Sequence, residues 1–519
     1  MPSMRNHSFW VVVALLAVIL IPVAFRSRTR VSAKPDETLI ILSPHNEAVR
    51  YEFERAFTAA HLQRTGRRVR IDWRTPGGTS EIARYLASAY LGAFQYEWES
   101  RLRQPWNAEV QAAFDNPKVA PGDVTVAARA RKAFLESKVS CGIDLFFGGG
   151  SFDFGQQAAA GRLVAFGKLD ALKAIPQTVG GEPYWDSQGR WAGAALSAFG
   201  ICSNTDALQR IGFAGVPKRW SDLAEPRLSG AVALADPTQS GSAAKAFEMV
   251  IQQQIVQAGG DPAEGWKRGL RLIRRISANA RYFSDSATRI VWDVESGDAA
   301  TGMAIDFYGR FQSEAVRRSD GTSRLEYITP VGGSSFGSDP VGMLRGAPSR
   351  GLAREFITFV LSPQGQKLWN WEVGAPGGPR KYALRRLPIL PELYAPEFER
   401  FRSDPDVDPF LWARENPPYH PEWTAPLFRT IAFVIQTVAI DPHDELCEAW
   451  GALIEAGFPP QATALFDDVS AIDYAMATTV IKPALSSAQK IDQTRLGKKL
   501  CDQFRKQYRD AAALARAGK

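Results

Sequence analysis

Apolar and polar residues follow two alternating patterns along much of this chain: short apolar runs, and segments with apolar residues at helical spacing. The first case begins at Thr38–Leu42, a β-branched and apolar run that predicts a strand. Ser43 and Pro44 follow, and Glu47–Leu62 then carries apolar residues at helical spacing. Ser43 fits the N-cap of that helix and Pro44 its first helical position. The pattern predicts a strand, a tight turn and a helix.

The same order of strand, turn and helix is expected at three further places. Their turns are 75–80, 148–151 and 236–242, preceded by expected strands at 69–73, 143–147 and 231–235 and followed by helical patterns from Ile82, Phe154 and Phe247. Strands that alternate with helices in this way predict an α/β fold with largely parallel pairing.

Two regions depart from this order. Residues 97–138 are charged and contain three prolines, so we expect an inserted helical segment there. From Leu390 to about Trp423 proline and aromatic residues dominate, and helical patterns then continue to the end. This predicts a mainly helical C-terminal extension, residues 391–519, which forms either a separate subdomain or a cap over the rest.

The N-terminal 33 residues have a different character. Phe9–Phe25 is uninterrupted and apolar, with arginine on both sides, and Val31-Ser32-Ala33 has the form of a cleavage site. Residues 1–33 therefore predict a signal peptide or an N-terminal membrane anchor, with the remainder exported to the periplasm or another extracytoplasmic space. A buried N-terminal helix of a cytoplasmic protein is disfavoured because the run contains no polar residue.

Composition narrows the protein class. A chain of 519 residues is too long for one compact core and suits two or three lobes. The net charge of +7 is spread along the chain without a long basic run, which disfavours nucleic acid and is compatible with an anionic ligand. The cysteines form no C-x-x-C pair, so neither a zinc site nor a thioredoxin-like motif is supported, and both free thiols and disulfides stay open. They are Cys141, Cys202, Cys447 and Cys501.

The four turns share a chemistry that suits a polar ligand. In open α/β sheets ligands bind beyond the carboxyl ends of the strands, where all four turns are expected. Each leads into a helix, whose first N–H groups lack intrahelical partners and favour anions or strong acceptors. A single such turn is usually only a helix cap, but four in one chain favour a shared cleft. Thr238–Ser242 is the turn richest in hydroxyl groups.

Several short segments, in order, resemble the type 2 periplasmic-binding-protein fold from about Thr38 to Leu390. They are closest to the iron(III), thiamine and phosphonate-type solute-binding proteins of ABC importers. The matching segments are LSAFGI at 196–201, WSDLAEP at 220–226, ADPTQSGS at 235–242, AIDFYG at 304–309 and FVLSPQGQ at 359–366. The resemblance implies two lobes that close on a hinge and deliver a solute to a membrane permease. It divides the chain into residues 38–197, residues 198–330 and a return to the first lobe at 331–390.

The resemblance also implies which residues bind the solute. The residues implied in the second-lobe turn are Thr238, Ser240, Gly241 and Ser242. Those in the first-lobe turns are Ser43, Gly78, Thr79, Gly149 and Gly150, and those in the segment that lines the cleft are Asp306 and Tyr308. His45 is added as the one histidine at a candidate turn, although an exposed histidine at a helix start is the simpler interpretation. Ferric relatives place two adjacent tyrosines where this chain has Phe307-Tyr308, so we expect a small polar or anionic organic solute ahead of iron.

We expect a monomer without cofactor, bound metal or catalytic residues, and two alternatives remain. Ser242-Ala243-Ala244-Lys245 satisfies the S-x-x-K pattern of serine enzymes, although no K-T-G or S-D-N accompanies it. Lys245 fits equally well as an exposed helix residue. The other alternative is a membrane-anchored ligand sensor or scaffold that uses the same binding lobes and reports to a partner.

Overall fold

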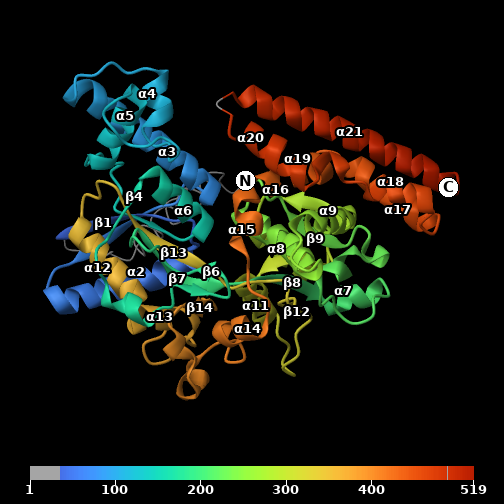
Figure 1. Ribbon diagram of the computed structural model, residues 1–519. Helices are drawn as coiled ribbons and strands as arrows, with labels where there is room; N and C mark the ends of the chain where they lie inside the picture. Colours follow the sequence, from blue (N-terminus) through green and yellow to red (C-terminus); the bar gives the residue numbers. More distant parts are fainter. Residues whose placement is uncertain (1–34, 488) are drawn as a thin grey trace, which may run out of the picture.

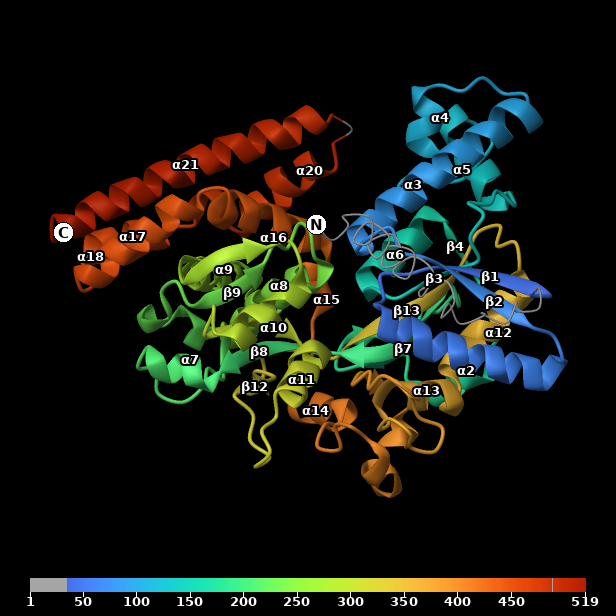
Figure 2. The ribbon, with the colours of Figure 1, turned by 180° about the vertical axis from the view of Figure 1, so that it is seen from behind.

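The computed structural model describes residues 35–487 and 489–519 (Figure 1). The expected signal peptide or anchor, residues 1–33, therefore lies outside the described residues. Two sheets, each covered by helices, form two lobes, and the C-terminal helices make a further layer against one of them (Figures 1 and 2). The predicted α/β, two-lobed fold with a helical C-terminal region is confirmed.

The first lobe is built on a seven-stranded sheet in the order β14-β7-β13-β3-β1-β2, with β4 paired to β13. Its strands are β1 (Glu37–Leu42), β2 (Val69–Arg74), β3 (Leu145–Phe147), β4 (Leu163–Val164), β7 (Trp191–Ser197), β13 (Gly337–Leu344) and β14 (Leu387–Pro388). Its helices are α2 (Glu47–Thr65), α3 (Thr79–Tyr96), α4 (Ala108–Ala113), α5 (Val126–Glu136), α6 (Ser151–Ala160), α12 (Arg350–Leu361) and α13 (Pro363–Asn370). A small hairpin, β5 (Thr178–Val179) and β6 (Glu182–Pro183), stands beside this sheet.

The second lobe is built on a five-stranded sheet in the order β10-β9-β11-β8-β12. Its strands are β8 (Phe199–Asn204), β9 (Val232–Ala235), β10 (Ala280–Ser284), β11 (Thr301–Ile305) and β12 (Leu325–Ile328). Its helices are α7 (Thr205–Arg210), α8 (Gly241–Gln257), α9 (Pro262–Ala278), α10 (Ala287–Ser296) and α11 (Asp306–Ala315).

Pairing in both sheets is mixed, so the expectation of largely parallel pairing is wrong. β1 runs parallel to β2 and β3, and β9 runs parallel to β10 and β11. The antiparallel strands β7, β8 and β13 are those by which the chain enters or leaves a sheet. β7 ends at Ser197 and β8 begins at Phe199, so the chain changes sheet at Ala198. It changes sheet again between β12 and β13, within residues 329–336.

Helix starts differ in detail from the sequence-based expectation. Asn46, not Ser43, is the N-cap of α2, because its side chain accepts the N–H of Val49 at 3.1 Å. The Ser43 hydroxyl is fully buried and instead accepts the N–H of His45 at 3.1 Å. Ser43 therefore fixes the turn before the helix rather than the helix itself.

The C-terminal extension packs on both lobes, and its helices from α16 onward share one core with the second lobe. After β14 and two short 3-10 turns, its helices are α14 (Pro409–Glu415), α15 (Pro421–Thr424), α16 (Phe428–Ile435), α17 (His443–Glu455), α18 (Pro460–Asp467), α19 (Tyr474–Met476), α20 (Lys482–Leu485) and α21 (Lys490–Arg516). Trp266 of α9 is fully buried and donates to the carbonyl of Ile472 at 2.9 Å. Arg274 of α9 donates to the hydroxyl of Tyr508 on α21 at 3.0 Å. Residues 393–412 of the extension pack instead against the first-lobe core, so the extension contacts both lobes, and its helices from α16 onward form a layer on α8 and α9.

One stretch of the described residues, Pro421–Ile440, is long and apolar enough to cross a membrane, but 56% of its most apolar window is buried. That burial is typical of a core helix, and α16 packs against α8. All four cysteines carry free thiols, and no disulfide joins them in the part of the chain that the structure describes. Cys202 and Cys501 are buried, and burial raises the pKa of the Cys202 thiol to about 12.

Candidate ligand-binding site

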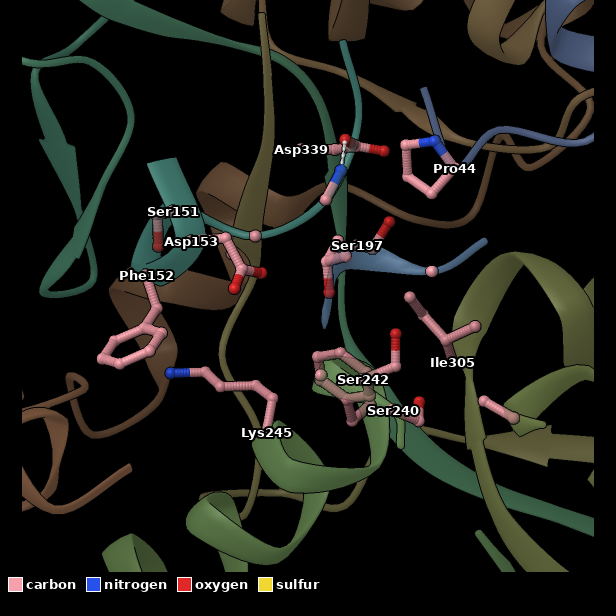
Figure 3. A pocket seen from close by; sticks show the side chains of 18 of the residues that line it. Pro44, Ser151, Phe152, Asp153, Ser197, Ser240, Ser242, Lys245, Ile305 and Asp339 are labelled. Atoms are coloured by element: carbon pink, nitrogen blue, oxygen red, sulfur yellow. Dashed lines mark hydrogen bonds between the residues drawn. The ribbon is translucent and has the colours of Figure 1, made fainter. Parts of the chain in front are cut away.

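A cavity of about 640 Å³ lies between the two lobes (Figure 3). This size falls within the range of small-molecule sites. The starts of α2, α3 and α6 line it from the first lobe, and the starts of α8, α10 and α11 line it from the second. The crossing strands form its floor near Ser197 and Phe199, and residues of the C-terminal extension complete the wall.

The helix starts present backbone donors to this cavity. Gly78 and Gly150 precede α3 and α6 as N-cap residues, and no side chain caps either helix. α10 likewise has no side-chain cap. The first N–H groups of such helices have no intrahelical partner, and the helix dipole adds positive potential at the same end. Glycine also allows a ligand to approach the backbone closely. Helix starts from both lobes therefore favour a ligand that carries strong hydrogen-bond acceptors.

Most of the residues expected to bind the solute line this cavity. They are His45, Gly78, Thr79, Gly149, Gly150, Ser240, Gly241, Ser242 and Tyr308. The Ser240 hydroxyl caps α8 by accepting the N–H of Ala243 at 3.2 Å. The Ser242 hydroxyl makes no hydrogen bond within the described residues, which leaves it available to a ligand.

Three expected residues do not line the cavity. Ser43 is buried behind His45, as described above. Thr238 forms a local turn in which its N–H and its hydroxyl both donate to Asp236 Oδ1, each at 2.7 Å. Asp306 is 1% exposed, and its carboxylate accepts the N–H of Phe307 at 2.8 Å. Local hydrogen bonds or burial thus explain why these three side chains do not reach the cavity.

His45 belongs to a buried polar triad rather than to an exposed helix start. It is 8% exposed, and its Nε2 lies 3.0 Å from Asp339 Oδ2 and 3.1 Å from an Arg386 guanidinium nitrogen. Arg386 also pairs directly with Asp339, and Asp339 Oδ1 accepts the N–H of Gly149 at 2.7 Å. Burial lowers the pKa of His45 and keeps the ring neutral at pH 7. Burial opposes ionisation of Asp339, yet the Arg386 charge and the His45 contact hold its pKa below the ordinary value.

Lys245 is held between two carboxylates on the opposite side of the cavity. Its Nζ lies 2.9 Å from Glu182 Oε1 of β6 and 2.9 Å from Glu248 Oε2 of α8. The same Nζ stands 3.5 Å from the centre of the Tyr419 ring. The Lys245 side chain is 17% exposed, so the expectation of an exposed helix residue is wrong. Its ion pairs explain the burial, because a charge inside a protein requires partners.

The same contacts argue against a serine enzyme. Burial alone would lower the pKa of Lys245, but Glu182 and Glu248 raise it overall, well above the ordinary value. A lysine that stays protonated cannot accept the proton of a serine nucleophile. No hydrogen bond joins Ser242 to Lys245 in the described part of the chain. Lys245 of the S-x-x-K pattern is therefore a structural cation, not a catalytic base.

Two further acids have raised pKa values. Asp153 lines the cavity at the start of α6, and burial raises its pKa to about 6 despite hydrogen bonds from Thr79 and from the N–H of Gly150. Burial also raises the pKa of Asp306 to about 6, although Arg310 opposes the shift. Asp153 thus places a carboxyl that titrates near pH 6 in the cavity wall.

The expected cleft tyrosine lies beside arginine rather than among metal ligands. Tyr308 packs against Phe307 with ring centres 4.2 Å apart, and the Arg386 guanidinium lies 4.4 Å from the centre of the Phe307 ring. Burial raises the pKa of Tyr308, which disfavours the phenolate that a hard metal ion would need. Over residues 35–487 and 489–519, no group of three or more His, Cys, Asp or Glu side chains could hold a metal ion.

Several wall residues were missed by sequence reasoning. They are Phe152, Glu182, Asp339, Arg386, Tyr419 and Phe428. None lies at one of the four turns; Phe152 directly follows the turn at 148–151 but looked like an ordinary helix residue. Tyr419 and Phe428 come from the extension, and their approach to the cavity depends on how that extension packs. No spacing in the sequence could have indicated it.

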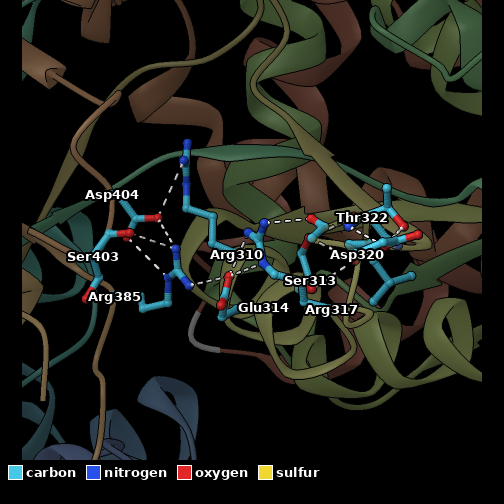
Figure 4. A network of polar contacts seen from close by, with 12 residues as sticks. Arg310, Ser313, Glu314, Arg317, Asp320, Thr322, Arg385, Ser403 and Asp404 are labelled. Carbon is cyan, nitrogen blue, oxygen red and sulfur yellow. Dashed lines mark hydrogen bonds and ion pairs between the residues drawn. The ribbon is translucent and has the colours of Figure 1, made fainter.

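A second polar network joins the lobes outside the cavity (Figure 4). Arg385 pairs with Asp404 at 2.7 Å on the first-lobe side. Across the gap to α11, Arg385 lies 3.6 Å from Glu314, and Arg310 lies 3.9 Å from Asp404. The contacts that cross between the lobes are longer than the Arg385–Asp404 contact on the first-lobe side.

Comparison with known proteins identifies the family. The profile described as bacterial extracellular solute-binding protein matches residues 139–399, which is half of the chain. An uncharacterised protein of Haemophilus influenzae is 28% identical over 232 residues, or 44% of this chain and 61% of the relative. The phosphoglycerate transport regulatory protein PgtC of Salmonella typhimurium is 26% identical over 174 residues, or 34% of this chain and 39% of the relative. The chain thus spans at most about three fifths of these curated relatives.

Solved structures give only general likeness. The periplasmic binding protein AfuA of Actinobacillus pleuropneumoniae, with fructose-6-phosphate bound, is 17% identical with a TM-score of 0.43, over 64% of this chain and 81% of its own. Iron-bound HitA of Pseudomonas aeruginosa is 16% identical with a TM-score of 0.45, over 76% of this chain and 98% of its own. With the family profile over half of its length, this chain belongs to the bacterial extracellular solute-binding proteins.

Proposed function

We propose that this chain captures a small polar or anionic organic solute in the cavity between its lobes and delivers it to an ABC permease of the inner membrane. The observation that carries the proposal is the meeting of uncapped helix starts from both lobes, those of α3, α6 and α10, at one cavity. Such ends suit phosphate, phosphonate or carboxylate oxygens.

Six acidic and two cationic residues line the cavity, so an anion depends on the helix starts for its attraction. Glu182, Glu248 and Asp339 are already paired with Lys245 or Arg386. The uncapped helix starts and the Ser242 hydroxyl are then the donors available to a ligand. The name of the Salmonella relative refers to phosphoglycerate, an organic phosphate, which supports the same class of solute. We place organic phosphates and phosphonates ahead of ferric ion.

We propose that the two lobes close on the solute by a hinge at Ala198 and residues 329–336. The first lobe comprises residues 38–197 and 331–390, and the second comprises residues 198–330. Hinge closure of this kind requires only a few residues to change backbone conformation. Small-angle scattering should show a smaller radius of gyration at saturating solute than without it. Identical profiles would indicate a rigid pocket.

Calorimetry with a defined panel tests the solute class. We suggest 3-phosphoglycerate, fructose 6-phosphate, methylphosphonate and ferric citrate, followed by Ser242→Ala with the best ligand. Loss of a hydrogen bond to a charged group should cost about 1.5–3 kcal/mol, or roughly tenfold or more in affinity. Ser229→Ala, at an exposed position outside the cavity, is the matched control. Tight binding of iron alone, or unchanged affinity in Ser242→Ala, would contradict the proposal.

Export is proposed from residues 1–33, acting as a cleaved signal or as a tether. Alkaline phosphatase fused to the C-terminus should be active in a bacterial host, because the enzyme requires export to fold. An inactive fusion, together with an active cytoplasmic reporter at the same point, would reverse the topology.

A membrane-anchored ligand sensor is the second candidate, favoured by the word "regulatory" in the name of the Salmonella relative. Under this alternative the leader stays uncleaved and the lobes report solute to a partner. N-terminal sequencing of the mature protein separates the two, since a soluble carrier should begin near Lys34. Permease and ATPase genes beside this gene would favour transport.

A further inference from the structure

The C-terminal extension reaches the cavity with a segment that lies beyond the family match. Tyr419, Pro421, Ala425 and Phe428 all line the cavity, whereas the family profile ends at residue 399. The extension is therefore not remote from the binding site. Its residues 419–428, here called the extension wall, close one side of it.

Buried polar side chains of α8 hold the extension wall in place. Glu248 Oε1 accepts from the hydroxyls of Tyr419 at 2.8 Å and Thr424 at 2.6 Å. Gln252 donates to the carbonyl of His420 at 2.7 Å and to Thr424 Oγ1 at 2.7 Å. Glu248 and Gln252 are 1% and 2% exposed, so these bonds are shielded from water. The wall is consequently a fixed part of the second lobe.

The same segment also touches the first lobe. The N–H of Tyr419 donates to the carbonyl of Gly180 at 2.8 Å, in the hairpin turn between β5 and β6. Gly181 has φ +82°, and a Cβ there would lie 1.8 Å from the Tyr419 carbonyl oxygen, which only glycine permits. The chain thus crosses between the lobes a third time, close to the cavity.

Two aromatic rings meet across the cavity at the extension wall. Phe152 comes from α6 of the first lobe and Phe428 from α16, and their ring centres are 4.6 Å apart. Both rings are only partly buried and both line the cavity. Figure 3 shows Phe152 extending from α6 toward the side of the cavity where Lys245 lies. The pair forms an apolar surface beside the start of α6.

We propose that Phe152 and Phe428 form a subsite for an apolar or planar part of the solute, so that the extension wall sets its specificity. The inference rests on the proposed function, because it assumes that the solute occupies this cavity. A volume of about 640 Å³ is far larger than one ion needs, since a water molecule in the liquid takes about 30 Å³. The solute class is then an organic molecule with a polar head for the helix starts and an apolar body for the two rings.

Matched ligand pairs test the subsite by calorimetry on the full-length protein. Phenyl phosphate and methyl phosphate share a head group and differ in the apolar body. We expect phenyl phosphate to bind at least tenfold more tightly than methyl phosphate in the wild type. Phe152→Ala and Phe428→Ala should each reduce this ratio to less than threefold and leave methyl phosphate binding unchanged. Leu411→Ala, at a 45% exposed position of the extension outside the cavity, should keep the wild-type ratio.

A second pair with the opposite charge separates the two proposals. If neither phosphate binds, the anionic preference of the proposed function is wrong, and benzyltrimethylammonium against tetramethylammonium then tests the rings with the same variants. If the wild type does not prefer the aromatic ligand in either pair, the inference is overturned. So does a preference that survives both Phe152→Ala and Phe428→Ala. Thermal unfolding of each variant without ligand shows that it is folded.

Discussion

Gly241 at the start of α8 lies directly against Thr79 at the start of α3. A Cβ built on Gly241 would stand 3.2 Å from Thr79 Oγ1 and 3.8 Å from Asp153 Oδ2. The two helix starts belong to opposite lobes, so the cavity is narrow at this point. Any side chain at position 241 occupies space that the lobes need when they approach each other.

Gly241→Ala should therefore weaken solute binding without destabilising the protein. The φ of Gly241 is not positive, so alanine fits this backbone. In a helix interior alanine is favoured over glycine by roughly 0.5–1 kcal/mol, and at the first position of α8 the gain should be smaller. We expect at least a threefold loss of affinity in calorimetry together with an unchanged or higher melting temperature. Gly451→Ala, in α17 with open space around its Cβ, should share the gain in stability and keep wild-type affinity. Unchanged affinity in Gly241→Ala would show that the lobes do not approach here.

Lys245→Met should destabilise the fold strongly. It would leave Glu182 and Glu248, both 1% exposed, without their cation. Removal of one partner of a buried ion pair typically costs about 3–5 kcal/mol. Urea unfolding at pH 7 measures the loss, and Lys267→Met, at a 46% exposed pair with Glu264, should change stability by less than about 1 kcal/mol. A loss in Lys245→Met as small as in this control would mean that the two buried ion pairs add no more stability than an exposed pair.

Anion binding should strengthen as the pH falls through 6. Burial raises the pKa of Asp153 to about 6, so its carboxyl is ionised at pH 7 and mainly neutral at pH 5. The ionised form repels an anion in the cavity, and protonation removes that repulsion. We expect affinity for the best organic phosphate to rise several-fold from pH 7 to pH 5, beyond the change in the ligand's own charge. Asp153→Asn should bind the organic phosphate tightly at both pH values. If this variant keeps the wild-type pH dependence, another titrating group causes that dependence.

Asp339→Asn should cost stability at neutral pH and much less in acid. Despite burial, the charge of Arg386 and the His45 contact lower the pKa of Asp339, so the folded state holds the proton more weakly than the unfolded state. The stabilisation is therefore present above the ordinary value of 3.8 and is lost as the pH falls through the lowered pKa. Urea unfolding should show a deficit of about 3–5 kcal/mol at pH 7 that shrinks below pH 4.

Asp206→Asn provides the control for that measurement. Asp206 pairs with Arg318 at 3.0 Å, but its side chain is 54% exposed. An exposed pair contributes about 0–1 kcal/mol, so little change is expected at any pH. An equal deficit in the two variants would show that burial of the Asp339 pair does not matter.

Local signals in the sequence were enough to find the turns of the site, but not their long-range partners. Gly78, Gly150 and Ser240 start helices at the cavity, because strand-turn-helix units place such residues at the carboxyl ends of strands. His45 looked like an exposed residue since its partners, Asp339 and Arg386, are about 300 residues away along the chain. Contacts at that separation depend on tertiary packing, which spacing alone does not encode.

The shared core of the second lobe and the extension limits how this chain can be shortened. Trp266 is fully buried against the extension, and Leu270 and Ile273 of the same helix belong to that core. A chain ending at Leu390 would expose this face of α9 to water, and large exposed apolar patches promote aggregation. Such a fragment would retain nearly all of the residues that the family profile matches, yet it should aggregate on its own. For this protein the smallest independent folding unit is consequently larger than the segment that the family profile matches.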